Sequence, residues 1–428
     1  MLQKSFGLFG LFLIALLSGL TGHFAWSQGA PARRIVVNPY AKVKWDTFRH
    51  HKANLHCHTL QSDGWHSVKE VVETYHKMGY TVLSITDHDW NWPNARVTWG
   101  HHPEELASPY PIGPLPKNYP ANTTWPWDKY GAPTPEKLGM VGIEGNELTF
   151  RHHINSYFSD YGVWYERTGK EAPYGGIVDK NGKEIWEDDQ LLDVKDKNGL
   201  AVINHPGIPN HHSWWERKPL QWYFERFSKH SNDYLVGIEV TNNDTETEKY
   251  DEGLWDQLLA RLMPDRPIWG FGGDDMHTFD REKTGHDGQK ETFTVFMLDE
   301  LSTDAVRQAM LDGQFYFCKS TRRIDPRKES AGIFPSIQKI EVDEKAGTIT
   351  VTASNYDSIR WISAPSSLNI TGDYRVDNQP WPMGTVVHTG NQIDLKKTAG
   401  IKNYVRAELT RQENGHTYRV FTNPFGIK

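Results

Sequence analysis

The chain of 428 residues is too long for one ordinary domain of about 100–200 residues, so we expect two domains or one barrel with an appendage. Hydrophobic residues make up 37% and aromatic residues 12%, which excludes a mostly disordered chain. The formal net charge is −7 without a long basic run, which argues against non-specific nucleic-acid binding. The two cysteines exclude a disulfide framework and a cysteine-based zinc module. Histidine is the unusual residue, because 16 of the 20 histidines lie between His50 and His277.

The first residues have the pattern of a signal peptide. Lys4 precedes a run over 6–20 that is almost wholly apolar or glycine, and small residues then stand at Ala25 and Ser27, the two positions that a signal peptidase reads. A run of about 15 residues is short for a helix that spans a bilayer. We therefore expect export, with cleavage near Ser27 and no stable membrane insertion of the mature chain. An uncleaved anchor helix is the alternative.

Apolar strands alternate with helices over residues 52–277. The run Ser67-Val68-Lys69-Glu70 is a capping box for a helix that Gly79 ends. This alternation predicts an α/β fold with a parallel sheet, open or closed into a barrel. The expected strands cover 53–59, 81–86, 140–150, 154–158, 200–204, 235–240, 268–272 and 293–298, and further helices cover 253–263 and 303–312.

Two stretches interrupt this alternation. Residues 91–137 hold ten of the 24 prolines and four tryptophans, and so many prolines argue against regular structure. Because this stretch begins three residues after His88, we expect it to form a lid over a site; a surface embellishment without a role is the alternative. The polar residues 160–189 are expected to form a hairpin excursion.

The character of the sequence changes after Ser320. A highly charged segment over 321–330 is typical of a linker, and short alternating runs follow from Ile337 onward. About 100 residues of this kind predict a small antiparallel β-sandwich. The expected organisation is a signal peptide over 1–27, a barrel over 28–320 with the insertion 91–137, and a β-sandwich domain over 331–428.

Five clusters of potential metal ligands lie on or just after the expected strands. On a strand, His56 and His58 point to the same face and Cys57 points away, so that two imidazoles converge on one point. In a parallel barrel the strand ends gather on one face, where barrels carry their sites. Histidine and carboxylate ligands suit Zn, Mn or Fe, and bridging carboxylates suit a site with several ions. The clusters are His56-Cys57-His58 with Ser62-Asp63-Gly64, Thr86-Asp87-His88-Asp89, Gly145–Thr149 with Arg151–Asn155, Asn204–Gly207 and Gly273–His277.

These clusters, in this order, resemble the motifs of the PHP (polymerase and histidinol phosphatase) superfamily. The resemblance covers residues 52–320 and includes His-x-His, Ser-Asp-Gly, Thr-Asp-His, Gly-x-Glu-x-Thr, His-Pro and Asp-x-His. The Gly-Asp-Asp-x-His form, the long loops, the signal peptide and the trailing β domain are most similar to the secreted CehA/McbA-like metallohydrolase branch. The resemblance implies a distorted (β/α)7 barrel, which is TIM-like, and up to three divalent metal ions.

The resemblance also implies which residues hold these ions. Glu147 would bridge two of the metals, and the three residues implied to act in catalysis are Glu147, Asp275 and His205. The implied ligands are His56, His58, Glu147 and Asp275 for the first metal, Glu147, His153 and His205 for the second, and Asp63, His88 and His277 for the third.

Three of these ligands have a neighbour that competes for the role. The Gly-x-Glu-Leu-Thr pattern, the His-hydrophobic-Asn pattern and the Asp-x-His spacing decide for the ligands named above. Asp87 and Asp89 are expected to orient ligating imidazoles from outside the ligand set. Arg151 is expected to bind an anionic substrate group, with a surface ion pair as the equally open alternative. The competing neighbours are Glu144, His152 and Asp274, of which Asp274 is also expected to act from outside the ligand set.

These features predict an exported, periplasmic or extracellular, metal-dependent hydrolase of a small-molecule ester. Phosphoester hydrolysis is the favoured reaction, because metal binding lowers the pKa of water from about 15.7 toward 7 and yields a hydroxide that attacks phosphorus. One alternative is hydrolysis of a carboxyl ester or carbamate, since the tryptophan-rich loop could line an apolar pocket and few arginines lie near the motifs. Another is a binding protein whose β domain holds a carbohydrate or the cell surface through Trp361 and Trp381.

Overall fold

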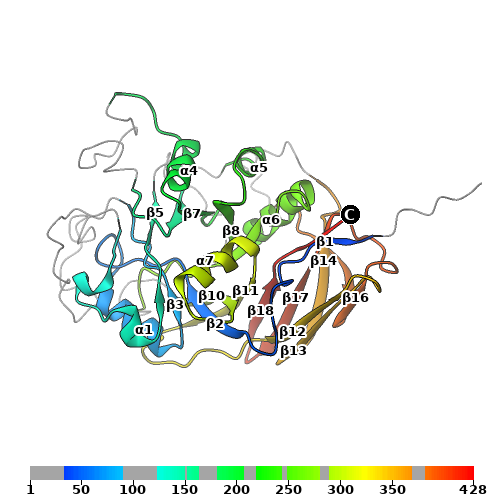
Figure 1. Cartoon of the computed structure of the whole chain (residues 1–428). Coiled ribbons are helices and arrows are strands. Elements are labelled where there is room, and N and C mark those ends of the chain that lie inside the picture. Colours follow the sequence, from blue (N-terminus) through cyan, green and yellow to red (C-terminus); the bar gives the residue numbers. More distant parts are fainter. Residues whose placement is uncertain are drawn as a thin grey trace, which may run out of the picture. The chain divides into compact units, whose positions relative to one another are not determined.

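A computed structural model describes residues 33–89, 123–149, 152–162, 181–206, 218–242, 248–279, 289–368 and 381–428 (Figure 1). These residues form a mixed α/β structure, as the alternation of strands and helices predicts. The expected signal peptide, Arg151 and most of the 91–137 stretch lie outside the described residues. Within the described ranges, no helix combines the length and the apolar character that crossing a bilayer requires.

The largest sheet has 11 strands and includes strands from both ends of the described chain. Nine form a continuous order and two more attach beside them. The order is β1 (Ile35–Val37), β19 (Phe425–Ile427), β17 (Tyr404–Glu413), β18 (His416–Thr422), β11 (Phe315–Ile324), β10 (Gln289–Leu298), β2 (Arg49–Asn54), β3 (Val82–Leu83) and β4 (Val141–Gly142), with β14 (Ser358–Ser363) beside β17 and β15 (Thr385–Thr389) beside β14.

Two smaller sheets complete the described strands. Their members are β5 (Gly145–Leu148), β6 (Ile154–Tyr157), β7 (Leu200–Ile203), β8 (Leu235–Thr241) and β9 (Trp269–Gly272) in one, and β12 (Ser336–Asp343), β13 (Thr348–Ser354) and β16 (Gln392–Asp394) in the other. The pairs β7–β8 and β8–β9 are parallel, but β5–β6 and β6–β7 are antiparallel. The expected parallel pairing therefore holds for β7, β8 and β9 but not for β5 and β6, because a short reversal after β5 returns the chain beside itself.

Local signals in the sequence set several helix ends. The Ser67 hydroxyl accepts a hydrogen bond from the Glu70 N–H at 3.2 Å, which caps α1, and Gly313 adopts φ +72° just after α7. The predicted helix 303–312 is confirmed as α7, whereas α4 and α5 are not foreseen by the sequence analysis. The described helices are α1 (Val68–Lys77), η2 (Trp127–Tyr130), α3 (Pro135–Leu138), α4 (Glu187–Asp196), α5 (Leu220–Lys229), α6 (Glu248–Leu262) and α7 (Thr303–Asp312).

The proline-rich stretch is not wholly irregular where the structure describes it. Within residues 123–137, η2 is complete and α3 begins, and Pro135 occupies the first turn of α3, where a missing N–H costs nothing. The Trp127 side chain is fully buried in the largest apolar cluster of the described residues. This end of the stretch therefore belongs to the core, and the expected role as a lid rests on residues outside the described ranges.

The sheets of the described residues do not close into one barrel. Strands β2, β3 and β4 form one parallel group, and β5 to β9 form a separate mixed sheet. The expected strand over 140–150 is broken into β4 and β5, which belong to different sheets although only two residues separate them. A continuous (β/α)7 barrel is therefore not shown by the hydrogen-bonded strands.

The C-terminal strands share one apolar cluster. Ile340 and Val351 of the three-stranded sheet are buried in the same cluster as Leu409 and Val420 of β17 and β18. Figure 1 shows these strands gathered beside one another. Strand β18 pairs with β11, and β11 extends to Ile324, so the charged segment expected to be a linker begins within a strand.

Two tryptophans expected to recognise a carbohydrate belong to the core instead. Trp361 is 0% exposed and Trp381 is 4% exposed. The indole N–H of Trp361 donates to the Gly390 carbonyl at 2.8 Å, which fixes the ring in place. A sugar ring needs an accessible aromatic face for stacking, so this expected binding role for the two side chains is wrong.

Candidate metal centre

The structure brings together all nine residues expected to bind metal. Strand β2 ends at Asn54, so His56 and His58 lie just beyond the strand rather than on it. An isolated parallel bridge between Cys57 and Met276 keeps this segment extended beside the segment that follows β9. Groups with ligand atoms within 4.8 Å of one another are His58-Asp63-His88-His277, His56-His205-Asp275, His56-His58-Glu147 and His88-Glu147-His153.

Glu147 lies at the centre of the cluster. Its Oε1 is 3.0 Å from both His153 Nδ1 and His205 Nε2, and 3.3 Å from His56 Nε2. Its Oε2 is 3.0 Å from His88 Nδ1. The side chain is 1% exposed. One carboxylate thus faces imidazoles from widely separated segments, which is the position that a bridging ligand requires.

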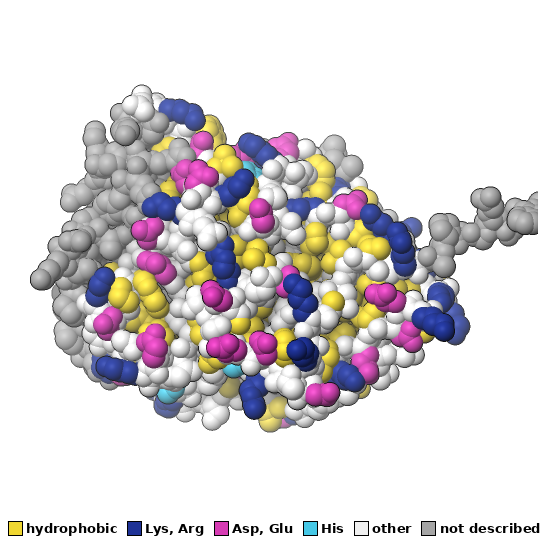
Figure 2. Space-filling model, viewed as in Figure 1, with side chains coloured by type: hydrophobic (Ala, Val, Ile, Leu, Met, Phe, Trp, Pro, Cys, Tyr) yellow, Lys and Arg dark blue, Asp and Glu magenta, His cyan; other side chains and the backbone are white. Residues whose placement is uncertain are grey.

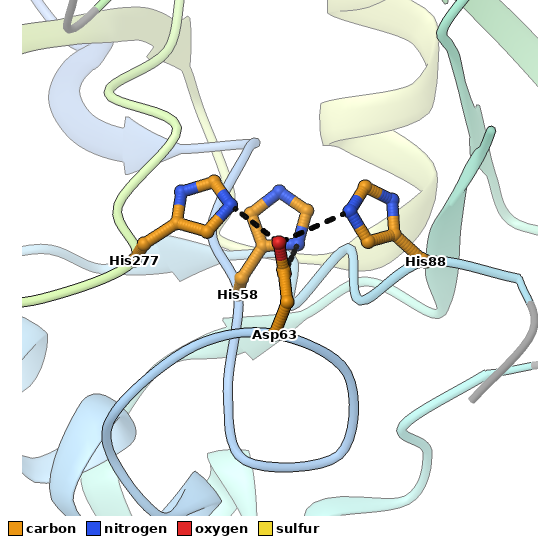
Figure 3. Close-up of side chains that lie close together, drawn as sticks. All are labelled: His58, Asp63, His88 and His277. Carbon is orange, nitrogen blue, oxygen red and sulfur yellow. Dashed lines mark hydrogen bonds and ion pairs between the residues drawn. The ribbon is translucent and has the colours of Figure 1, made fainter. Parts of the chain in front are cut away.

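Asp63 forms a second centre (Figure 3). Its Oδ2 is 3.1 Å from His277 Nε2 and 3.5 Å from His88 Nε2, and its Oδ1 is 3.4 Å from His58 Nδ1. The rings of His58 and His277 are stacked with their centroids 4.2 Å apart. His58 and His88 therefore each contact both Asp63 and Glu147, and the two centres adjoin.

Asp275 faces the cluster, and its neighbour Asp274 faces away. Asp275 Oδ1 is 3.2 Å from His56 Nε2 and 3.0 Å from His58 Nε2. The Asp274 carboxylate instead accepts hydrogen bonds from the Tyr75 hydroxyl at 2.7 and 2.9 Å. Asp275 has φ +46°, a left-handed conformation that few non-glycine residues adopt. This turn separates the directions of two consecutive carboxylates.

The other two competing neighbours also lie outside the cluster. Glu144, which precedes β5, accepts a hydrogen bond from the Thr123 hydroxyl at 2.9 Å. His152 Nε2 lies 3.0 Å from the Tyr223 hydroxyl and its ring packs edge-on against the tyrosine. The placement of all three pairs agrees with the choice made from the motifs, whereas ligation itself stays a prediction.

The aspartates that flank His88 act on backbone and hydroxyl groups. Asp87 accepts hydrogen bonds from the Thr59 N–H at 2.7 Å, the Thr59 hydroxyl at 2.6 Å and the Ser62 hydroxyl at 2.6 Å. Asp89 N–H donates to the Glu147 carbonyl at 2.9 Å. Within the described ranges Asp87 touches no ligating imidazole, contrary to the expectation, and instead holds the loop that carries Asp63.

Two residues that contact the cluster have no role among those expected from the sequence. Glu239, in the middle of β8, has its Oε1 3.1 Å from His56 Nδ1. Asn204 donates to Glu147 Oε1 at 2.8 Å. The sequence contains a signal for each residue. Glu239 is a charged residue within the apolar run LVGIEVT, and Asn204 directly precedes the candidate ligand His205.

The distances fit ligands around cations. The Nε2 atoms of His56 and His58 are 3.3 Å apart, and both face Asp275 Oδ1. Ligand atoms at about 2.1 Å from a tetrahedral zinc ion lie about 3.4 Å from one another. The buried donor set, imidazole and carboxylate without thiolate, suits Zn, Mn or Fe.

The charges of the site require compensation. Burial raises the pKa of the Glu147 carboxyl, but imidazoles, chiefly that of His153, hold it well below its ordinary value. Burial raises the pKa of the Asp63 carboxyl too, but the imidazoles of His277 and His88 together hold it well below its ordinary value. Among the described residues, neither Glu147 nor Asp275 forms an ion pair with lysine or arginine. Buried carboxylates without such partners are costly unless cations neutralise them.

Solvent reaches the cluster from one side. The exposed fraction of the His277 side chain is 28%, that of Asp275 is 14% and that of Asp63 is 12%. The other six side chains are at most 6% exposed. A substrate would therefore reach the cluster past these three residues.

Comparisons with known proteins are distant. No model of a protein family and no curated protein matches the sequence. A two-domain protein from Bacteroides vulgatus, described as containing a predicted PHP-like metal-dependent phosphoesterase, aligns with 17% identity and a TM-score of 0.40, over 89% of this chain and 95% of that one. An amidohydrolase from Chromobacterium violaceum with bound sulfate and no metal aligns with 14% identity and a TM-score of 0.32, over 61% of this chain and 96% of that one. At these TM-scores the likenesses establish neither a shared fold nor a shared activity.

Proposed function

We propose that this protein is a metal-dependent hydrolase of the PHP type, with phosphoesters as its substrates. The observation that carries the proposal is the position of Glu147, a buried carboxylate that contacts imidazoles from four separate segments. The motif order of the sequence supports the same class, and the buried carboxylates need cationic partners. The CehA/McbA-like branch is the part of the family that the long loops and C-terminal strands favour.

The protein residues would divide the work as follows. Bound divalent cations, two or three of Zn, Mn or Fe, would lower the pKa of a water molecule and neutralise negative charge on a phosphoryl group. Glu147 and Asp275 would hold these cations close together by their negative charge. His205 is 6% exposed, and its Nε2 lies 3.0 Å from Glu147 Oε1. It would take part in catalysis as a ligand of the second metal. Arg151 would bind an anionic part of the substrate.

The proposed architecture is a distorted barrel followed by a β-sandwich domain. Two isolated bridges, Cys57 to Met276 and His88 to Glu147, link the β2–β4 strands to the β5–β9 sheet at the end that carries the ligands. These bridges support a barrel over residues 28–320 in which only isolated bridges, and no continuous strand pairing, join the β2–β4 strands to the β5–β9 sheet. Residues 331–428 would form the second domain, which the pairing of β18 with β11 joins to the first.

We propose in addition that residues 1–27 direct export and are then removed. The apolar run and the small residues at Ala25 and Ser27 support this. Amino-terminal sequencing of protein recovered from the periplasm or medium tests it, because the mature chain should begin near residue 28. A chain that retains Met1 and stays with the membrane would contradict it.

A small ester fits the surface better than a polyanionic partner. Figure 2 shows lysine and arginine side chains interspersed with acidic ones over the face in view. Such mixing creates no strong positive field that would attract nucleic acid. The narrow exposure of the candidate metal centre also favours a substrate that presents a small group to it.

A substrate panel tests the proposed reaction. The purified protein, supplied with Mn or Zn, should hydrolyse a phosphomonoester or phosphodiester, lose this activity with a chelator and regain it when metal returns. Metal-dependent hydrolysis of carboxyl esters or carbamates alone would favour the alternative reaction at the same site. If the metal-loaded protein hydrolyses none of these substrates, the proposed function is wrong.

A further inference from the structure

Glu239 is a buried charge in a strand that otherwise has none. Strand β8 reads LVGIEVT, and every residue of it is buried. The Glu239 side chain is 3% exposed. Burying a carboxylate without compensation costs several kcal/mol, so its partners should indicate its role.

The partners of Glu239 belong to two different groups of candidate ligands. Its Oε1 lies 3.1 Å from His56 Nδ1. Its Oε2 accepts hydrogen bonds from the backbone N–H of His205 at 3.0 Å and from the Asn242 side-chain amide at 2.9 Å. One carboxylate therefore joins the segment after β2 to the segment after β7.

A third segment approaches the same carboxylate without a side chain of its own. A Cβ atom placed on Gly273 would lie 2.3 Å from Glu239 Oε1 and 2.9 Å from the His56 Cβ. Only glycine fits there. The turn that carries Asp275 can thus pack directly against Glu239 and His56.

The contact at Nδ1 determines what the other ring nitrogen of His56 can do. A carboxylate only accepts hydrogen bonds, so the proton of the imidazole must be on Nδ1. The Nε2 atom, which faces Asp275 Oδ1 at 3.2 Å and His58 Nε2 at 3.3 Å, is then the atom available to a cation. An acceptor behind a ligating imidazole also raises its basicity.

We propose that Glu239 is a positioning residue for the metal centre, which keeps the Nδ1 proton of His56 in place and fixes the backbone at His205. The inference rests on the proposed metal-dependent function. Glu239 is 3% exposed and contacts His56 Nδ1 and the His205 N–H, so it acts through the two histidines.

The Glu239→Gln variant tests this role at constant shape. An amide presents one acceptor and one donor, so it cannot satisfy both the His56 Nδ1–H and the His205 N–H. Affinity for Zn, measured by competition with a chelating dye, should fall about 10–100-fold. The Glu239→Asp variant, which keeps the charge, should recover part of this loss. Glu144→Gln is the matched control, because that carboxylate contacts Thr123 outside the cluster, and its affinity should equal that of the wild type.

A measurement on the wild-type protein tests the same inference without relying on a variant that folds. In 15N–1H spectra of protein labelled at histidine, the Nδ1 proton of His56 should be present in both the metal-free and the Zn-loaded forms. A His56 that lacks the Nδ1 proton, or an unchanged Zn affinity in Glu239→Gln, would overturn the inference. A wild-type protein that binds no metal would refute the proposed function instead, and the Nδ1 measurement on the metal-free form would still decide the role of Glu239.

Discussion

The buried ion pair between Asp256 and Arg406 joins α6 to the C-terminal strands and permits a quantitative prediction. The Arg406 guanidinium donates through Nε and Nη2 to the two Asp256 oxygens, at 3.0 and 2.8 Å. The Tyr404 hydroxyl and the Gly384 N–H donate to the same carboxylate, each at 2.7 Å. The exposed fraction of the side chain is 1% for Arg406 and 0% for Asp256.

The Asp256→Asn substitution should therefore destabilise the protein strongly. The variant places an amide donor against groups that themselves donate, and it leaves the buried charge of Arg406 with only Glu408, 3.8 Å away, as a counterion. Breaking a buried ion pair from one side costs about 3–5 kcal/mol. That is a large part of the roughly 5–15 kcal/mol by which a folded domain is stable.

Equilibrium unfolding in urea, with chelator present so that metal binding does not contribute, measures this cost. The control is Asp265→Asn, the same substitution in the pair that Asp265 makes with Lys428, where the aspartate is 79% exposed. The free energy of unfolding should change little in the control. Replacing both members of the buried pair, in Asp256→Leu/Arg406→Met, should cost less than Asp256→Asn alone. If Asp256→Asn is no less stable than the control, the reasoning is refuted.

Two further predictions concern carboxylates. Glu147→Gln should lower metal affinity at least about 10-fold, because it removes a charge shared by two metals, whereas Glu144→Gln should not. Competition with a chelator measures the affinity of both variants. A loss of affinity in Glu144→Gln but not in Glu147→Gln would contradict the assigned register of β5. Burial raises the pKa of the Glu252 carboxyl, but Arg419 and Lys319 lower it well below its ordinary value. Ionised Glu252 therefore stabilises the fold at neutral pH, and this stabilisation is lost as the pH falls below about 4.3. Urea midpoints measured down to acid pH should fall less steeply in Glu252→Gln than in the wild type, and equal slopes would contradict this.

The helices and strands that could be predicted from the sequence are those with local signals at their ends. Helix α7 agrees with its prediction because the apolar spacing stops at Gly313, which supplies the left-handed φ of +72°. The antiparallel return of β6 along β5 could not be predicted in the same way. Pairing such as that of Glu147 with Asn155 depends on the direction of a loop, which alternation of apolar residues does not encode.

The residues of the candidate site also differ in how far local sequence signals could predict them. His56, His58 and His88 stand in short motifs, so their convergence could be anticipated from residues next to them in sequence. For Glu239 the sequence offers only a charged residue within an apolar strand, because its partner His56 is 183 residues away and no motif surrounds it. The role of Asp87 is equally hard to predict, because a carboxylate next to a ligand can hold a neighbouring loop instead of an imidazole.

Metal content is the measurement that tests the central claim most directly. The purified mature protein, reconstituted and freed of excess metal, should retain two or three divalent ions per chain by elemental analysis. Glu147→Gln, prepared in parallel and shown to be folded, should retain fewer, because it lacks the carboxylate that lies 3.0 Å from three imidazoles. No more than trace metal in the reconstituted wild-type protein would contradict the account.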